Sequence, residues 1–329
     1  MKMAAYAATS NASRWREVEF INAFSIQLAN NTIFTRKNSI LSQNNFAAFK
    51  VLARHISLVE NQVPEAAALM EQLRPLPIPV VGFTGPPGAG KSTLLNALLG
   101  FLLEQNKRVA LLLVDPSSPF NFGALLGDRL RMSHYFTHPN VFIRSVATRG
   151  SLGGLSDTIL EVTEVLRTFP FDVVFIETVG VGQSEVEIAG LADVTVVTLV
   201  PEAGDAVQAM KAGLMEIADI FVINKADRQG AEAMAHALEL QLHLNNRDVP
   251  VLRTTAVESV GIPALWTAIT NRFQAPRSER QLHLLTEKCL RLIQKKRMQD
   301  IDIRQLRQQL AAAATQTDFS IFRFIKQLV

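Results

Sequence analysis

The chain has very little cysteine and no long uninterrupted apolar run. Cys289 is the only cysteine among 329 residues, so no disulfide can form within the chain, which suits a reducing compartment. No apolar run approaches the roughly 20 residues that a membrane-spanning helix needs. A lone cysteine inside a helical pattern is typical of a small core residue rather than of a nucleophile, and we expect this of Cys289.

Residues that would mark a metal site or a signal-binding domain are also sparse or dispersed. The six histidines and eight methionines do not cluster. His134 and His138 lie four residues apart, but Pro139 follows directly and no cysteine is near. We therefore interpret both as surface or helix-end residues rather than zinc ligands.

Apolar residues make up 48% of the chain and charged residues 19%, so the chain can bury a large core. The net charge of +3 is unevenly distributed. Residues 276–329 contain 11 Lys/Arg and 5 Asp/Glu, a net charge of +6, so the rest carries −3. A slightly acidic main domain argues against general nucleic-acid binding.

The most informative stretch is VVGFTGPPGAGKST at residues 80–93. A short β-branched run is followed by a glycine-rich turn and a leucine-rich helical pattern, with the spacing G-x-x-x-x-G-K-[ST] of a phosphate-binding loop. In this loop, backbone N–H groups and the helix N-terminus bind phosphates, while Lys91 reaches the β- and γ-phosphates and Ser92 can bind Mg²⁺. The predicted nucleotide contacts are Gly85, Gly88, Ala89, Gly90, Lys91, Ser92 and Thr93.

Buried-strand patterns recur after this loop, separated for the most part by helical stretches. The apolar runs are residues 109–114, 141–143, 173–176, 194–200, 220–223 and 249–252. This alternation predicts an α/β fold, a P-loop NTPase with a mostly parallel sheet and flanking helices. Ligands of such sheets bind at the carboxyl ends of the strands, where the polar candidates below occur.

The sequence Asn224-Lys225-Ala226-Asp227 follows one of these strands and has the N-K-x-D pattern of a guanine reader. One carboxylate, that of Asp227, can accept both N1–H and the 2-amino group of guanine, which adenine cannot offer. The Lys225 stem can cover the base, and Asn224 can tie this loop to the phosphate loop. Thr255-Ala256 is similar to the turn whose backbone N–H meets guanine O6 in many GTPases.

Three acidic residues are candidates for a magnesium switch. Glu177, in Glu177-Thr178-Val179-Gly180, occupies the place where GTPases usually have D-x-x-G, with Gly180 as the γ-phosphate sensor. Asp115 closes the second strand and Asp128 follows in the same post-strand segment. Each acid could instead be a strand-end or helix-capping residue.

Four regions are predicted along the chain. Residues 1–45 form an N-terminal extension without a signal-peptide pattern, and residues 46–79 form a helical preface with a proline linker. Residues 80–275 form the P-loop domain. Residues 276–329 form a helical C-terminal arm for dimerisation or a partner, and its helical pattern covers residues 277–310.

Together, these motifs resemble the GTPases associated with methylmalonyl-CoA mutase, formerly described as arginine/ornithine transport ATPases, within the signal-recognition-particle-like class. The strings that carry the resemblance are GPPGAGKST, VDPSSP, LGDRLRM, THPNVFIRSVATRGSLGGLS, ETVGVGQSEVEIA, VPEAGDAVQAMKAGLMEIADIFVINKADRQGAE and GIPALW. They extend over most of the chain.

The resemblance implies GTP/GDP and Mg²⁺ as cofactors. Ser92, Asp115, Asp128 and Glu177 match the family's metal-site and switch residues, and Lys211 matches a third switch linked to partner-stimulated hydrolysis. It further implies a homodimer that gates loading of an adenosylcobalamin-dependent acyl-CoA mutase, with the cobalamin held by the partner. The expected location is cytoplasmic, or the mitochondrial matrix in a eukaryote.

Three other functions fit parts of the sequence. A GTP-dependent chaperone for nickel enzymes would need His/Cys-rich metal sites, and a membrane-targeting GTPase would need a methionine-rich domain. A small-molecule kinase or transport ATPase is disfavoured by the guanine reader. The sequence therefore favours a GTP-hydrolysing chaperone of a cobalamin-dependent mutase.

Overall fold

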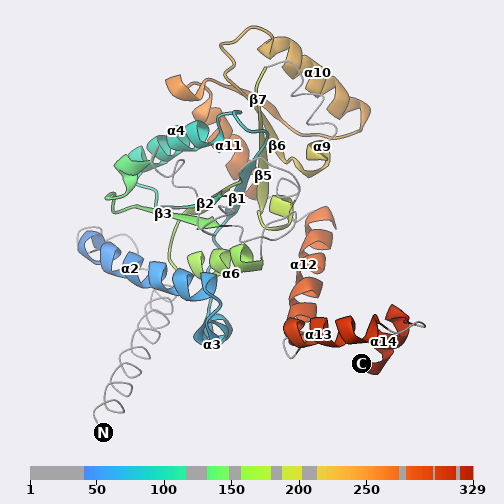
Figure 1. Cartoon of the computed structure of the whole chain (residues 1–329). Helices are drawn as coiled ribbons and strands as arrows, with labels where there is room; N and C mark the ends of the chain where they lie inside the picture. The colour runs from blue at the N-terminus through green and yellow to red at the C-terminus, as the bar shows by residue number, and fades with distance from the viewer. Residues whose placement is uncertain are drawn as a thin grey trace. The chain divides into compact units, whose positions relative to one another are not determined.

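A computed structural model describes residues 41–115, 132–147, 157–178, 187–201, 213–273, 279–298, 301–315 and 319–328. The chain divides into two compact units, Met1–Gln281 and Leu282–Val329, which are described separately below. The first contains the β-sheet, and the second consists of helices (Figure 1).

Seven parallel strands form one sheet in the order β3-β2-β4-β1-β5-β6-β7. The predicted parallel α/β fold is thereby confirmed, and the phosphate-loop strand β1 is the central strand. The strands are β1 Val80–Thr84, β2 Val109–Asp115, β3 Val141–Ala147, β4 Val173–Glu177, β5 Val194–Leu199, β6 Ile220–Asn224 and β7 Val251–Thr254.

Two strands differ from the predicted runs by more than one residue at an end. β3 continues to Ala147 because it pairs with β2 along its whole length, beyond the apolar run at 141–143. β7 begins at Val251, two residues later than predicted. Pro250 has no N–H to donate to a ladder, although its carbonyl accepts the N–H of Phe221 at 2.9 Å, so the strand begins after it.

Helices cover both faces of the sheet (Figure 1). Within the described ranges, the helices of the first unit are α2 Leu41–Glu60, α3 Pro64–Gln72, α4 Lys91–Glu104, α6 Asp157–Leu166, α9 Leu214–Ile217, α10 Ala231–Leu244 and α11 Ile262–Phe273, besides the start of α12. The same part of the chain contains three short 3₁₀ helices, η1 Ser133–Tyr135, η2 Ile188–Gly190 and η3 Ala256–Glu258. η1 contains His134, and His138 lies in the turn after it, so the four-residue spacing of the two histidines does not lie on an α-helix.

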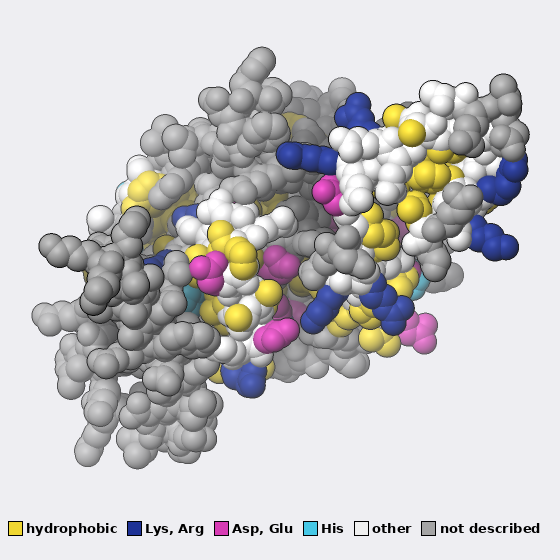
Figure 2. Space-filling model, turned by 60° about the horizontal axis from the view of Figure 1, so that its bottom comes forward, with side chains coloured by type: hydrophobic (Ala, Val, Ile, Leu, Met, Phe, Trp, Pro, Cys, Tyr) yellow, Lys and Arg dark blue, Asp and Glu magenta, His cyan; other side chains and the backbone are white. Residues whose placement is uncertain are grey.

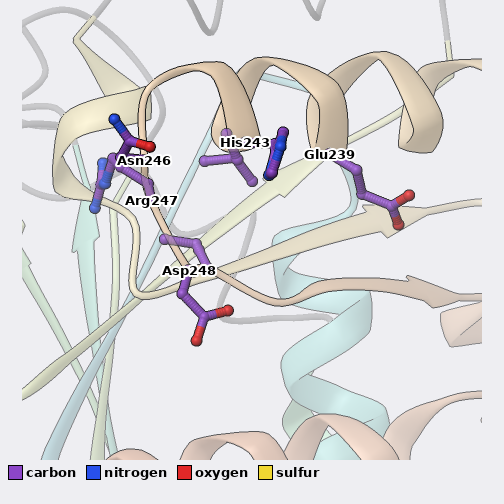
Figure 3. Close-up of a pocket in the computed structure, with 7 residues that line it drawn as sticks. Glu239, His243, Asn246, Arg247 and Asp248 are labelled. Carbon is purple, nitrogen blue, oxygen red and sulfur yellow. The ribbon is translucent and has the colours of Figure 1, made fainter.

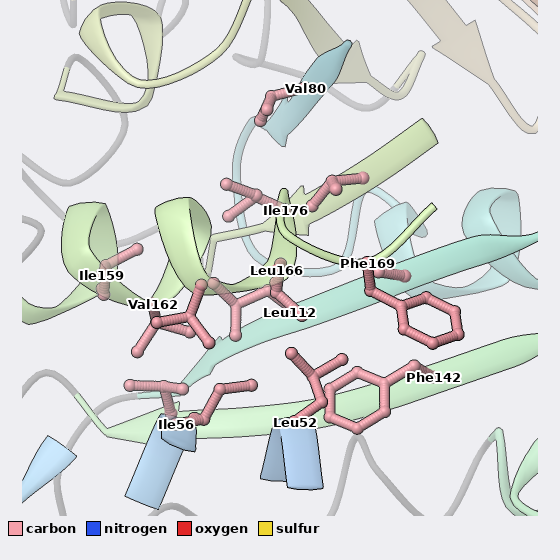
Figure 4. Close-up of a cluster of buried hydrophobic side chains, with 14 of the residues drawn as sticks. Leu52, Ile56, Val80, Leu112, Phe142, Ile159, Val162, Leu166, Phe169 and Ile176 are labelled. Atoms are coloured by element: carbon pink, nitrogen blue, oxygen red, sulfur yellow. The ribbon is translucent and has the colours of Figure 1, made fainter. Parts of the chain in front are cut away.

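Two apolar clusters form the core, one on each face. Buried residues of α2, α3 and α6 pack with Leu112 and Ile176 on one face, and those of α4 and α11 pack with Phe83 and Phe175 on the other. Figure 4 shows Leu52 of α2 directed toward the first cluster. Both faces of the central strands are covered, which explains why these strands appear as continuous apolar runs.

The helical preface is tied to the sheet edge by polar contacts as well. The side-chain amide of Asn45 donates to the carbonyl of Pro139 at 3.1 Å. Arg144 of β3 donates to Ser57 Oγ at 3.1 Å and forms an ion pair with Glu60 of α2. α2 is therefore a packed part of the first unit.

The amino-terminal end of the sheet contains a repeated aspartate pairing. Asp172, Asp193 and Asp219 each stand immediately before a strand, and each carboxylate accepts a backbone N–H at 2.8–2.9 Å from the start of a neighbouring strand or, for Asp172, from Arg108 just before β2. The N–H of each aspartate donates back to the carbonyl of the same neighbouring residue at 2.7–2.9 Å. These pairs satisfy backbone groups where the ladder begins.

The second unit contains most of α12 Glu279–Arg297, together with α13 Ile303–Ala313 and α14 Ile321–Leu328. α13 begins at an N-cap, because Asp302 accepts the N–H groups of Arg304 and Gln305. α14 lies beyond the predicted helical region. Cys289 is exposed, so its assignment to the core was wrong: in α12, apolar residues such as Leu282 and Ile293 are also half-exposed.

Candidate functional site

The phosphate loop connects β1 to the N-terminus of α4 and requires glycine at two positions. Gly85 has φ +132°, and a Cβ there would collide with the backbone oxygen of Thr198 in β5. Gly90, the N-cap of α4, has φ +82°, and its Cβ would collide with the side-chain amide of Asn224. Left-handed backbone and close approach together explain these glycines.

Lys91 and Ser92 form the first turn of α4 and are 6% and 7% exposed, so the two side chains are held within the loop. The Lys91 ammonium donates to the carbonyls of Gly85 at 2.8 Å and Pro86 at 3.0 Å. A buried cation therefore lies along the loop, next to the positive end of a helix, which is a suitable environment for phosphate.

Glu177 comes from the strand next to β1. Phe83 lies opposite Glu177 in the ladder, so the end of β4 reaches the start of the phosphate loop. Ser92 Oγ donates to Glu177 Oε1 at 2.6 Å, and Glu177 as a whole is 7% exposed. The structure thus brings together the serine and the acid that the sequence assigned to one metal site.

Asn224 connects three loops at the carboxyl end of the sheet. Its amide donates to Ala89 O at 3.0 Å, while its Oδ1 accepts from Thr254 Oγ1 and from the Ala256 N–H, both at 3.2 Å. Asn224 is 2% exposed. The link between the guanine-reader loop and the phosphate loop that the sequence suggested is therefore present.

The other residues of the guanine motif follow Asn224 in the turn after β6. Asp227 is exposed there, and Lys225 is half-buried with φ +55°. The Thr255 N–H donates to Val260 O, and the Ala256 N–H donates to Asn224, each at 3.2 Å. Contact between guanine O6 and these amides would require the hydrogen bonds to be shared or exchanged.

Several predicted residues fall outside the described part of the site. Asp128, Gly180 and Lys211 lie outside the described residues, and for Asp115 only the backbone at the end of β2 is described. Thr93 follows Ser92 in α4 and is half-buried. Gly88 and Ala89 form the tip of the loop, where Ala89 is buried and a Cβ on Gly88 would meet nothing within 4 Å.

Three buried threonines at or beside the site were not predicted from the sequence. Thr254 donates to Asn224, and Thr84 and Thr178 contact each other at 3.1 Å behind the phosphate loop. Their signal was present in the sequence, since each lies at or just after the end of a predicted strand. Threonine is common in strands, so its residue type alone did not distinguish these positions.

A separate hollow of about 390 Å³ lies at the other end of the sheet, where α10 leads into β7. Glu239, His243, Arg247 and Asp248 line it (Figure 3). The Arg247 guanidinium donates to the carbonyls of Met215 and Ala218, which ties α10 to the turn before β6. This arrangement makes Arg247 a structural residue, remote from the phosphate loop.

The described residues contain no group of three or more His, Cys, Asp and Glu side chains arranged to hold a metal ion. Within the same part of the chain, no helix combines the length and apolar character needed to cross a membrane.

Comparisons with known proteins agree with the motifs. A protein of Pyrococcus abyssi, named provisionally as a GTPase, is 50% identical over 229 residues, which cover 67% of this chain and 71% of that protein. The GTPase ArgK of Escherichia coli is 40% identical over 232 residues, covering 66% of this chain and 70% of ArgK. The mouse protein named methylmalonic aciduria type A homolog, mitochondrial, is 40% identical over 194 residues, or 56% of this chain and 47% of the mouse protein.

A solved structure, the crystal structure of LAO/AO transport system kinase, superimposes with a TM-score of 0.60 and 27% identity, over 88% of this chain and 97% of that one. The sequence pattern of the family described as methylmalonyl Co-A mutase-associated GTPase MeaB matches residues 52–312. The chain therefore belongs to the MeaB family of methylmalonyl Co-A mutase-associated GTPases, and its activity is the binding and hydrolysis of GTP.

Proposed function

We propose that this GTPase is a chaperone for an adenosylcobalamin-dependent acyl-CoA mutase. The client would be methylmalonyl-CoA mutase or a relative, and the GTPase would gate the loading of its cofactor and protect the enzyme. The observation that carries the proposal is the family match over residues 52–312. The similarity to the mouse protein whose name refers to methylmalonic aciduria supports the same client. Cobalamin would be held by the mutase.

The phosphate end of the proposed site consists of Lys91, Ser92 and Glu177. Magnesium prefers oxygen ligands, and the Ser92 hydroxyl and the Glu177 carboxylate supply two oxygens 2.6 Å apart beside the phosphate loop. Their chemistry fits a Mg²⁺ ion, which would neutralise charge on the phosphates. Lys91 holds its positive charge along the same loop, so it can bind the β- and γ-phosphates.

The base end of the proposed site is the turn after β6. Asp227 is exposed there and can accept both guanine donors, while the Lys225 stem covers the base. Asn224 fixes this turn to the phosphate loop through Ala89 and to the Thr255–Ala256 turn through Ala256. A buried side chain that joins the two halves keeps base and phosphate contacts at a constant separation.

Four further roles complete the proposal. Asp115 and Asp128 act with Glu177 at magnesium, and Gly180 senses the γ-phosphate through its N–H. Lys211 belongs to the segment through which the mutase stimulates hydrolysis. The segment follows β5, which ends at Leu199 and pairs with the phosphate-loop strand β1. A partner that orders the segment would therefore act close to the phosphate loop.

A GTPase site that lacks a fully ordered set of charges hydrolyses slowly, and ordering by a partner can supply several kcal/mol. The test is GTP turnover with and without the purified acyl-CoA mutase encoded nearest this gene. We expect stimulation for the parent protein and its loss for Lys211→Ala, which should keep most of the intrinsic rate. Turnover that saturating mutase leaves unchanged, with no complex in either nucleotide state, would contradict the chaperone role.

We propose further that the protein is a homodimer and that the C-terminal unit provides the contact. Leu282, Leu290 and Ile293 of α12 are 48–59% exposed, and Figure 2 shows apolar side chains interspersed with Lys and Arg on this unit. A second copy would remove this apolar surface from water. Light scattering should give twice the chain mass for the parent and the chain mass for Leu290→Asp, whereas His283→Asp, which removes no apolar side chain, should remain dimeric.

The proposed location is the cytoplasm, or the mitochondrial matrix in a eukaryote. The lone cysteine and the mitochondrial relative support a reducing compartment. Fractionation of cells that produce the tagged chain checks this expectation.

A further inference from the structure

Two threonines meet behind the phosphate loop, and neither has a role in the site described above. Thr84 is the last residue of β1, and Thr178 directly follows β4. They are 0% and 1% exposed. Thr178 Oγ1 lies 3.1 Å from Thr84 Oγ1 and 3.4 Å from the carbonyl oxygen of Phe83, and the Thr178 N–H donates to the same carbonyl at 3.0 Å.

The contact between the two threonines lies on one face of the sheet, and the carboxylate of Glu177 lies on the other face. Side chains alternate between the faces of a strand. Ile176 packs in the cluster on the α6 face and Phe175 in the cluster on the α4 face, so Glu177 faces α4 and Thr178 faces α6. Glu177 indeed contacts Ser92 of α4. The end of β4 is therefore held on one face through a carboxylate and on the other through a hydroxyl.

The chain neighbours of the pair belong to the phosphate site. Thr84 precedes Gly85, whose carbonyl accepts the Lys91 ammonium, and Thr178 follows Glu177. The hydroxyl contact therefore adds a side-chain link between the end of β4, next to Glu177, and the residue that precedes the phosphate loop. We infer that the Thr84–Thr178 hydroxyl pair is a positioning element, which fixes the end of β4 on the phosphate loop and so holds the Glu177 carboxylate at Ser92.

The inference rests on the proposed role of Ser92 and Glu177 at magnesium. A purely structural pair would make a different prediction, because its loss would lower stability without changing magnesium dependence. The two readings are separated by comparing Thr178→Val, which keeps the shape but removes the hydroxyl, with Thr178→Ser, which keeps the hydroxyl. Thr84→Val and Thr84→Ser provide a second pair should Thr178→Val not fold.

The matched control is Thr163→Val in α6. Thr163 is 2% exposed and its Oγ1 donates to the carbonyl of Ile159 at 2.7 Å, so this change also removes one buried hydroxyl contact, away from the phosphate loop. For each variant, binding of a fluorescent non-hydrolysable GTP analogue is titrated with Mg²⁺, and the melting temperature is measured without nucleotide. GTP turnover against Mg²⁺ is a third measurement.

For Thr178→Val we expect the Mg²⁺ concentration at half-maximal binding to rise about fivefold, the factor that corresponds to one lost hydrogen bond of about 1 kcal/mol. For Thr178→Ser this concentration should stay within about twofold of the parental value, because serine keeps the hydroxyl. Thr163→Val should keep the parental magnesium midpoint, even if its melting temperature falls as far as that of Thr178→Val.

A Thr178→Val midpoint equal to that of the parent, or a Thr178→Ser midpoint equal to that of Thr178→Val, would overturn the inference. Glu177→Gln is measured in parallel to separate this failure from that of the proposed metal site. If Glu177→Gln raises the midpoint and Thr178→Val does not, only the positioning role fails. If Glu177→Gln keeps the parental midpoint, the metal role of Glu177 fails and the positioning role fails with it.

Discussion

At the amino-terminal end of the sheet, Asp172, Asp193 and Asp219 stand before strands, whereas at the carboxyl-terminal end Glu177 closes one. The three aspartates accept backbone N–H groups from residues at or just before the start of neighbouring strands. Glu177 accepts instead from the hydroxyl of Ser92 in the first turn of α4. Carboxylates of similar chemistry therefore have different partners at the two ends of one sheet.

The direction of the parallel strands explains this difference. At the amino-terminal end, strands begin with N–H groups that need acceptors, and a preceding aspartate supplies one close by. At the carboxyl-terminal end, the chain turns into helices whose N-termini attract anions. Acids at the first end therefore stabilise the fold, whereas polar groups at the second are available for nucleotide. The following predictions test this division, in order of decreasing effect on nucleotide chemistry.

The largest effect is expected for Lys91→Ala. GTP hydrolysis should fall about 1,000-fold, because phosphoryl transfer depends on positioned positive charge. Phosphate release under single-turnover conditions measures this loss.

Lys107→Ala is the matched change at the amino-terminal end of the sheet, where Lys107 pairs with Asp172 at 3.2 Å and is 40% exposed. An exposed pair contributes only about 0–1 kcal/mol, so its rate should be parental. Hydrolysis by Lys91→Ala at the parental rate would contradict the catalytic assignment of this loop.

The next effect concerns base choice. Asp227→Asn should lower the preference for GTP over ATP about 100-fold or more, because a site that pairs specific polar groups rejects an analogue strongly. The variant should also admit xanthine nucleotides, whose 2-oxo group can accept from the new amide. Calorimetry in the presence of Mg²⁺ measures the affinities. The control is Asp248→Asn, beside α10, which should keep the parental preference for GTP over ATP. Equal affinities of the parent protein for GTP and ATP would exclude the guanine reader.

A smaller effect is expected for Glu177→Gln. The variant should need about tenfold more Mg²⁺ for half-maximal turnover, the lower end of what losing a metal-orienting partner causes. GDP binding without metal should change little. Glu164→Gln in α6, whose carboxylate pairs with Arg167 at 3.4 Å, is the control and should retain the parental midpoint. If both variants needed the same Mg²⁺ concentration for half-maximal turnover, Glu177 would have no role at the metal and would only end the strand.

The smallest effect on nucleotide chemistry is expected for Asp193→Ala. Val80 would lose the acceptor of its N–H, now 2.9 Å away, and stability should fall by about 1–3 kcal/mol. Urea denaturation measures this loss. Affinity for GTP and the magnesium midpoint should remain parental, because the pairing lies at the opposite end of β1 from Gly85. A change in GTP affinity beyond about threefold at 25 °C would show that the two ends are coupled.

Much of the fold could be predicted because the signals are local. The apolar runs gave all seven strands, and the glycine–lysine–serine pattern placed the phosphate loop between a strand and a helix. The boundaries were less certain: β3 extends further because β2 pairs with it, and β7 starts later because of Pro250. A helical pattern predicted a core position for Cys289, yet its side chain is exposed.

By itself, the sequence determined the class of ligand and most of the candidate residues, since a phosphate loop and a guanine motif are short and depend on residue types. The tertiary structure decided the strand order, which places β4 and β5 on either side of β1 and brings Glu177 to Ser92. It also decided that Asn224 joins two loops more than 100 residues apart in the chain and that Thr84 meets Thr178. Such contacts depend on which strands become neighbours, and strand pairing is set by packing over the whole sheet rather than by any local pattern.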